Sequence, residues 1–225
     1  MTNRGALFRN LILGGQDGLV NVLGIILGVA TATNSNQIVI IAGIAATVAE
    51  SISMAAVAYT SINAESEHYH SEVARVKNEI ENDPQIKKDE MKSVYSDMGF
   101  SGDLLEKIVE SVASKKKLWL NLLIHEKLKL DDPSEDMDPL FQGLIVGGSA
   151  VIGSIIPLIP FFFFSINEAI FYSLLFSLLS LFIFGAYKSQ LTSGKWLRGG
   201  MELMLIGGGA ALSGYLVGLL LGVKV

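Results

Sequence analysis

Five stretches of the sequence are long and apolar enough to cross a lipid bilayer as α-helices. A spanning helix needs about 20 mainly apolar residues, because a rise of about 1.5 Å per residue must cover about 30 Å of hydrocarbon. Half of the 225 residues are apolar and the mean hydropathy is +0.47, a composition typical of membrane proteins. We therefore predict an all-α, five-span transmembrane helical bundle with spans at Leu11–Thr33, Ile38–Ile62, Leu140–Phe164, Ala169–Tyr187 and Gly199–Val223.

A charged segment separates the second and third spans. Residues Asn63 to Asp138 contain 18 of the 22 acidic residues and 11 of the 17 basic ones, which gives this segment a net charge of −7. Such a density of charge needs water around it. We divide the chain into spans 1 and 2 (residues 1–62), an acidic helical domain (residues 63–138, called the insert) and spans 3 to 5 (residues 139–225).

Turn and capping signals predict short helices in the insert. The second span is expected to continue through Glu81, until Asn82-Asp83-Pro84 stops it and Pro84 begins the next helix. Gly99 fits a helix C-cap, and Ser101 fits the N-cap of the helix that follows. A last helix ends near Leu130, before the polar linker Asp131–Asp138, and its apolar residues include Leu118, Leu122 and Leu128.

The orientation follows from the lysines and arginines in short segments beside the spans, which favour the cytoplasm. The turns Asn34–Gln37 and Ser165–Glu168 have no positive charge, so they are expected on the opposite side. The N-terminus, which shows no cleavage pattern, and the insert are therefore predicted to be cytoplasmic. Short loops and a minimal N-terminal segment favour a prokaryotic plasma membrane over a vacuolar membrane. The positive residues on the cytoplasmic side include Arg4, Arg9, Lys188, Lys195 and Arg198.

Glycines recur four residues apart in the spans, which places them on one helix face. Small residues on one face let two helix backbones approach closely, so we expect most of these glycines to pack helix against helix. Some could instead line a dimer interface. The pairs and triplet are Gly14 and Gly18, Gly24 and Gly28, Gly143 and Gly147, and Gly214, Gly218 and Gly222. Pro157 and Pro160 predict a kink or a loosened turn near the outer end of the third span.

Two acidic residues lie inside predicted spans. Asp17 is in the first span with Asn21 one turn further on, and Glu50 is in the second span with Met54 one turn further on. A carboxylate at membrane depth costs at least about 2.5 kcal/mol, so it is expected to face a partner or a water-filled path. Because a short turn joins the two spans, we predict that these four side chains share one cavity.

The available donors restrict the ligand chemistry. The chain has no cysteine, so a disulfide, a thiolate zinc site or an iron–sulfur cluster is excluded. Carboxylates with a soft thioether suit Fe²⁺ or Mn²⁺ better than Mg²⁺ or Ca²⁺, although Co²⁺ and Zn²⁺ stay open. No basic stretch interleaved with aromatic residues supports nucleic-acid binding. No phosphate-binding loop or nucleophile elbow is present, and no prosthetic group is expected.

The sequence resembles the vacuolar iron transporter family over nearly its whole length. The resemblance depends on Gly14-Gly15-Gln16-Asp17-Gly18-Leu19, Ser51-Ile52-Ser53-Met54-Ala55, Pro157-Leu158-Ile159-Pro160 and Ile183-Phe184-Gly185-Ala186-Tyr187-Lys188, together with the helical insert. It implies a homodimer of five-span subunits that exchanges cytosolic Fe²⁺, and in some members Mn²⁺, for protons. It also implies that Asp17 and Met54 line the ion path. A glutamate of the family falls at Ala46 here, and we expect Glu50, one turn further on, to replace it.

The insert carries a second set of candidate ligands. Glu65, His68, Glu72 and Glu79 follow one helical stripe, where they either bind metal or form a solvated face. The single Glu65-x-x-His68 lacks the second such pair that a di-iron bundle needs. The resemblance implies that the family's metal-collecting positions fall at Val76, Glu79, Lys87, Glu90, Leu123, Ile124 and Lys127, so only Glu79 and Glu90 keep a carboxylate.

These patterns predict a transporter of divalent metal ions and not an enzyme. The expected partners are the metal ion, protons, the lipid bilayer and a second copy of the chain. Two other classes stay open. One is a membrane-anchored metal-binding or sensing protein in which the insert is the active part, and the other is an intramembrane metal-dependent enzyme.

Overall fold

The structure is a computed structural model that describes residues 3–131, 138–192 and 194–222. The residues it describes form helices joined by short turns, with no strand among them, so the all-α prediction is confirmed. The chain divides into two compact units, one of Met1–Thr60 with Asp136–Val225 and one of Ser61–Glu135. We call them the bundle and the insert unit. The predicted linker lies almost wholly outside the described residues, as does the predicted end of the fifth span at Val223.

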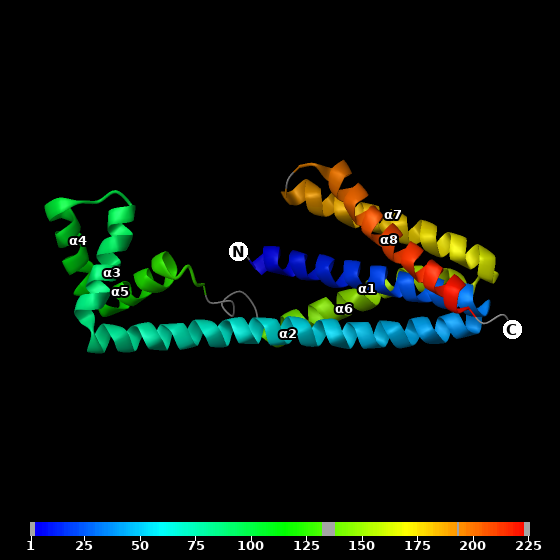
Figure 1. The fold of residues 1–225 in the computed structure, drawn as a ribbon, viewed down its shortest axis with the longest axis horizontal. Helices are drawn as coiled ribbons and strands as arrows, with labels where there is room; N and C mark the ends of the chain where they lie inside the picture. The colour runs from blue at the N-terminus through cyan, green and yellow to red at the C-terminus, as the bar shows by residue number, and fades with distance from the viewer. Residues whose placement is uncertain (1–2, 132–137, 193, 223–225) are drawn as a thin grey trace. The chain divides into compact units, whose positions relative to one another are not determined.

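Five helices are long and apolar enough to cross a membrane, as predicted. The helix α2 runs unbroken from the second span into the insert unit, which confirms the predicted stop before Pro84. A 3₁₀ turn, η3, ends the third span. The bounds are α1 Asn3–Thr33, α2 Asn36–Asn82, α6 Pro139–Leu158, η3 Ile159–Phe162, α7 Ile166–Thr192 and α8 Trp196–Leu221 (Figure 1).

Helix α1 is the centre of the bundle. Figure 1 shows α1 running beside α6, with α8 crossing it, and both pairs are in close contact. Leu19 packs with Leu181 of α7 and Leu203 of α8, while Val22 and Ile26 belong to an apolar cluster that reaches α2, α6 and α7. Helix α1 therefore shares apolar clusters with all four other spans.

Glycines make these contacts possible, as the four-residue spacing predicts. Gly14 and Gly18 of α1 face backbone carbonyls of α6, where a side chain would collide. A Cβ at Gly28 would lie 3.0 Å from the carbonyl oxygen of Gly214 on α8, and one at Gly143 would lie 2.7 Å from that of Ala55 on α2. These glycines therefore pack helix against helix within one subunit.

The outer faces of the bundle helices are apolar, as a lipid-exposed surface requires. Large apolar side chains such as Ile152, Leu205 and Leu220 are well exposed on α6 and α8. Polar side chains are found inward instead. The buried Asn10 amide donates a 2.9 Å hydrogen bond to Gln142 Oε1 and so ties α1 to α6.

The prolines of the third span end its α-helix, as predicted. The α-helical geometry of α6 ends at Leu158, and Ile159–Phe162 continue as 3₁₀ helix. Ser173 of α7 donates a 2.7 Å hydrogen bond to the carbonyl oxygen of Pro157, so a neighbouring helix satisfies this freed acceptor. At the same end, Asn36 Nδ2 donates to the carbonyl oxygens of Phe161 and Phe164.

The insert unit has its own apolar core. The helices α3 (Pro84–Asp97), α4 (Gly102–Ala113) and α5 (Lys116–Leu122), followed by a π-helical turn η1 (Leu123–Lys127), gather beside the last turns of α2 (Figure 1). Gly99 has φ +96°, which fits the predicted C-cap, and Ser101 is the N-cap of α4. Leu118 of the predicted apolar stripe is 47% exposed, because Trp119 turns into the core in its place. The core consists of Val76, Ile80, Met91, Leu105, Val109, Val112, Trp119, Leu123 and Ile124.

Two adjacent glycines of α6 offer a matched test of close packing. A Cβ at Gly147 would lie 2.7 Å from the carbonyl oxygen of Ser51 and 2.9 Å from the Ala55 Cβ, whereas one at Gly148 would meet nothing within 4 Å. We expect Gly147→Ala to destabilise the bundle by about 1 to 3 kcal/mol through overpacking. Gly148→Ala should be neutral or slightly stabilising. Thermal unfolding of the detergent-solubilised variants measures both, and equal melting temperatures would contradict the α2–α6 contact.

Candidate functional site

Two carboxyl groups meet inside the bundle. Asp17 lies on α1 beside Gly14 and Gly18, whose close approach to α6 fixes the rotation of α1. Glu50 lies on the part of α2 that packs on α1, and both acids are half-buried. The hydrogen bond from Asn21, one turn further along α1 than Asp17, to Glu50 of α2 places the two acids near each other. The structure therefore brings together the two intramembrane acids, as the two-span arrangement predicts.

Asn21 contacts the same acid from one turn further along α1. Its Nδ2 donates a 3.0 Å hydrogen bond to Glu50 Oε1. Asn21 is exposed in the isolated subunit, at the edge of an apolar groove of about 450 Å³ between α1 and α8. Glu50 is thus held between Asp17 and Asn21, two residues of one α1 face.

Met54 and Ala46 lie on the same α2 face as Glu50, one turn to either side. Met54 is half-buried. Ala46 packs against the apolar cluster that contains Val22 and Ile26, and this cluster holds no charged group. The carboxylate that meets Asp17 is therefore the one at Glu50, as we expect from the sequence.

This arrangement has a simple electrostatic consequence. Two carboxylates in contact repel each other strongly in a medium of low dielectric constant, so they need a cation or a shared proton between them. A divalent cation would receive oxygen ligands from both acids and, from Met54, a thioether. The same pair can accept protons in place of the cation.

The acids of the insert unit are neutralised in another way. Lys87 Nζ lies 2.6 Å from Glu79 Oε2 and 2.7 Å from Glu90 Oε2, and Lys127 Nζ lies 2.7 Å from Glu90 Oε2. Arg75 reaches the other oxygen of Glu79 at 2.7 Å. The chain from Arg75 to Lys127 therefore alternates positive and negative charges, and we call these five residues the ion-pair network.

The ion-pair network shifts the pKa values of its members. Hydrogen bonding from Lys87 holds the pKa of Glu79 below its ordinary value. Burial opposes ionisation of Glu90, but hydrogen bonds from Lys127 and Lys87 outweigh it and keep its pKa low as well. Burial alone would lower the pKa of Lys87, yet its two carboxylate partners raise it. Glu79, Glu90 and Lys87 are consequently charged at neutral pH.

The remaining candidates of the insert do not form a cluster. Glu72 is paired with Arg75 at 2.6 Å, while Glu65 and His68 are exposed on the preceding turns of α2. Within the ranges that the structure describes, no three Asp, Glu or His side chains come together as a metal site. Metal binding at Glu72, Glu79 or Glu90 would first have to displace an arginine or a lysine.

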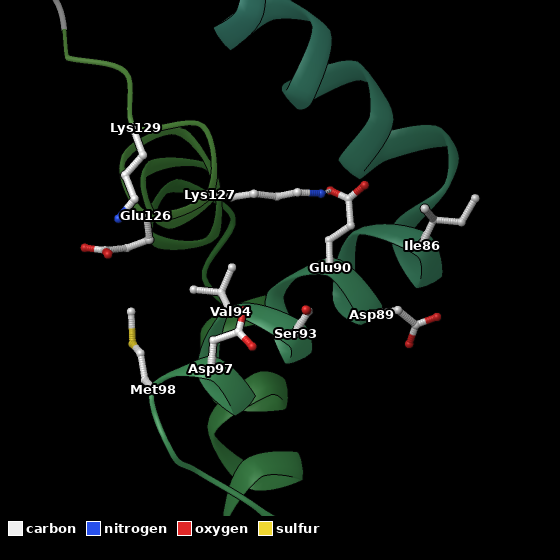
Figure 2. A pocket seen from close by; sticks show the side chains of 10 residues that line it. All are labelled: Ile86, Asp89, Glu90, Ser93, Val94, Asp97, Met98, Glu126, Lys127 and Lys129. Carbon is white, nitrogen blue, oxygen red and sulfur yellow. Dashed lines mark ion pairs between the residues drawn. The ribbon is translucent and has the colours of Figure 1, made fainter.

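A wider pocket of about 740 Å³ lies beside the network, between α3 and the segment around η1. Figure 2 shows Lys127 reaching across to Glu90, with Glu126 and Lys129 on one side and Asp97 and Met98 of α3 on the other. The pocket is lined by four acids, Asp89, Glu90, Asp97 and Glu126, and by Lys127 and Lys129, and Lys127 pairs with Glu90 at 2.7 Å.

Two features of the insert unit and the bundle were missed by the sequence prediction. Lys87 and Lys127 were placed at family positions, but their contact with Glu79 and Glu90 depends on how α2, α3 and η1 fold together. The Asn10–Gln142 hydrogen bond joins residues 132 positions apart. The sequence did carry a signal for the lysine contacts. Lys87 and Lys127 stand at two metal-collecting positions of the family, and Glu79 and Glu90 keep their carboxylates at two others.

The ion-pair network makes a testable contribution to stability. Lys87→Met should destabilise the insert unit by about 1 to 2 kcal/mol at pH 7, because it leaves two partly buried carboxylates without their shared cation. Since the folded pKa values of Glu79 and Glu90 are lowered, their contribution is present above the unfolded value of about 4.3 and is lost as the pH falls through the folded values. The difference between wild type and variant should therefore shrink below about pH 4.

The fluorescence of Trp119, which is 3% exposed, reports unfolding of this unit in a Trp196→Phe background. Lys92→Met is the matched control on the same helix, because Lys92 pairs with Glu106 at an exposed position. Equal losses in the two variants would show that the network adds nothing beyond an ordinary surface pair.

Comparison with known proteins identifies the family. The family model described as VIT family matches residues 8–219. A vacuolar iron transporter of Centaurea cyanus is 29% identical over 212 residues, which cover 94% of this chain and 86% of the relative. Vacuolar iron transporter 1 of Arabidopsis thaliana is 29% identical over 94% of this chain and 84% of its own length. A vacuolar iron transporter of Plasmodium berghei is 30% identical, with 95% of this chain and 81% of the relative covered.

These relatives are named as transporters and not as enzymes, in agreement with the prediction that the chain is not an enzyme. The family match covers nearly the whole chain, from the first span to the fifth. The resemblance inferred from the motifs is thereby confirmed: the chain belongs to the VIT family.

Proposed function

We propose that this protein transports a divalent metal ion, Fe²⁺ first and Mn²⁺ second, through the membrane and out of the cytosol in exchange for protons. The observation that carries the proposal is the contact between Asp17 and Glu50 inside a five-span bundle. An intramembrane acid is costly, and a pair of them is a functional feature by default. The iron-transporter names of the relatives identify the class of cargo.

The proposed ligands of the transported ion are the Asp17 and Glu50 carboxylates and the Met54 thioether. A carboxylate must lose its proton to bind a metal ion, and its reprotonation from the far side releases the ion. One pair of acids thus alternates between one divalent cation and protons. This exchange avoids leaving two unpaired charges in a region of low dielectric constant.

The orientation and the partner follow from separate features. Lysines and arginines beside the spans favour a cytoplasmic N-terminus and insert, so the ion would leave the cytosol. A homodimer is supported by the exposure of Asn21 next to the apolar groove between α1 and α8, because a second copy would cover this polar edge. We place the protein in a plasma membrane, where such transport removes excess metal.

The sensing function has weaker support, since the insert acids at Glu72, Glu79 and Glu90 are already paired with cations. We propose that the metal path lies in the bundle, with Glu65 and His68 of the insert as a solvated face.

Neutral replacements of the two acids test the transport site. In proteoliposomes, Asp17→Asn and Glu50→Gln should each lower Fe²⁺ uptake by at least about 10-fold, because each removes a charged ligand and its proton. Glu202→Gln is the matched control, because Glu202 is an exposed acid on α8. Uptake at the native rate by Asp17→Asn would show that the path lies elsewhere.

An imposed pH gradient tests the coupling. Vesicles with an acidic interior should take up Fe²⁺ faster than vesicles without a gradient, because outward proton movement drives inward metal movement under antiport. A proton ionophore should remove the difference. Measuring Mn²⁺, Co²⁺ and Zn²⁺ in the same vesicles ranks the cargo, and a rate that does not depend on the gradient would exclude proton exchange.

A further inference from the structure

The intramembrane pair has a third polar neighbour with a distinct chemical role. Asn21 donates through Nδ2 to Glu50 Oε1 at 3.0 Å. An ionised carboxylate accepts hydrogen bonds, and Asn21 presents its amide nitrogen to Glu50. Nitrogen of an amide does not bind metal ions as oxygen does. The observed contact therefore uses Asn21 to orient Glu50 and leaves the coordinating oxygens to the acids.

The surroundings of Asn21 give it no other polar role. The groove beside it is lined on α1 by apolar residues and glycines, and Ser213 is the polar side chain from α8. The Ser213 hydroxyl donates back to the carbonyl oxygen of Gly209 on its own helix. An amide placed in such apolar surroundings is expected to find a hydrogen-bond partner, and Asn21 finds it in Glu50.

The positions of Glu50 on α2 and Asn21 on α1 explain why a residue that orients Glu50 is useful here. Glu50 lies one helical turn beyond Ala46, which packs into the apolar cluster around Val22 and Ile26. Asn21 likewise lies one turn beyond Asp17. A long, flexible glutamate that carries the second charge of the site must be kept close to Asp17, and a hydrogen bond to one of its oxygens restricts its rotamers.

We propose that Asn21 is a positioning residue: it holds the Glu50 carboxylate against Asp17 so that both acids are preorganised for one divalent cation. The proposal rests on the transport site described above. It assigns to Asn21 an indirect contribution to cation affinity, made through Glu50. Removal of an outer-shell partner of this kind typically lowers metal affinity about 10-fold to 100-fold.

The test measures Mn²⁺ affinity of the full-length protein by electron paramagnetic resonance, since Mn²⁺ is stable in air. Asn21→Leu, which has a similar size and no donor, should raise the Kd about 10-fold and raise the transport KM by a similar factor. Asn21→Gln, which keeps the amide, should recover part of the loss. Thermal unfolding should give the same melting temperature for these variants as for wild type.

A double-mutant cycle separates positioning from direct binding. In a Glu50→Ala background, Asn21→Leu should have no further effect on the Kd, because the group that Asn21 orients is gone. An equal loss in both backgrounds would overturn the proposal, since Asn21 would then bind the ion itself or act through packing. An unchanged Kd for Asn21→Leu in the wild-type background would overturn it too.

The proposed function fails in a distinguishable way. If Asp17→Asn and Glu50→Ala bind and transport Mn²⁺ like wild type, the site itself is wrong. If these two variants bind Mn²⁺ more weakly than wild type and Asn21→Leu does not, the transport site stands and only the positioning role is wrong.

Discussion

The close packing of α1 against its neighbours is the constraint on which the bundle depends. Gly14 and Gly18 bring its backbone against α6, and Gly28 brings it against Gly214 of α8. With both sides fixed by backbone contact, α1 has no freedom to rotate, so Asp17 must point along the remaining direction, towards α2. The contact of Asp17 with Glu50 is thus a consequence of glycine packing several residues away.

The architecture was largely readable from the sequence, because length and hydropathy alone decide whether a helix crosses a bilayer. The unbroken α2 was also predictable, since no proline interrupts it before Pro84 and its one glycine, Gly43, lies near its beginning. The insert was harder. The apolar residues of its last helix were visible in the sequence, but a helix as short as α5 has no long periodicity to fix its rotation, and Trp119 is buried while Leu118 is exposed. The π-helical turn at η1 has no sequence signature that we recognise.

The residues of the candidate site could be predicted from the sequence, but the role of each residue could not. Intramembrane acids are rare enough to identify Asp17 and Glu50 without a structure. Whether Asn21 contributes its oxygen or its nitrogen depends on what lies opposite, and only the hydrogen bond to Glu50 shows that. In the insert, Glu79 and Glu90 looked like ligands as long as their neighbours in space were unknown. Lys87 and Lys127 come from different helical segments, so no local spacing could have placed them there.

The bundle and the insert unit neutralise their closely spaced acids with different cations. In each, acids approach closely and need positive charge between them. The insert unit supplies that charge from its own lysines and arginine, which makes the arrangement permanent. In the bundle, no ion pair joins Asp17 or Glu50 to a lysine or arginine among the described residues, which fits our proposal that a cation from outside the chain supplies the charge. A compensating charge that is not covalently attached can leave again, and this difference makes the bundle, rather than the insert, the part of the molecule suited to carry an ion across the membrane.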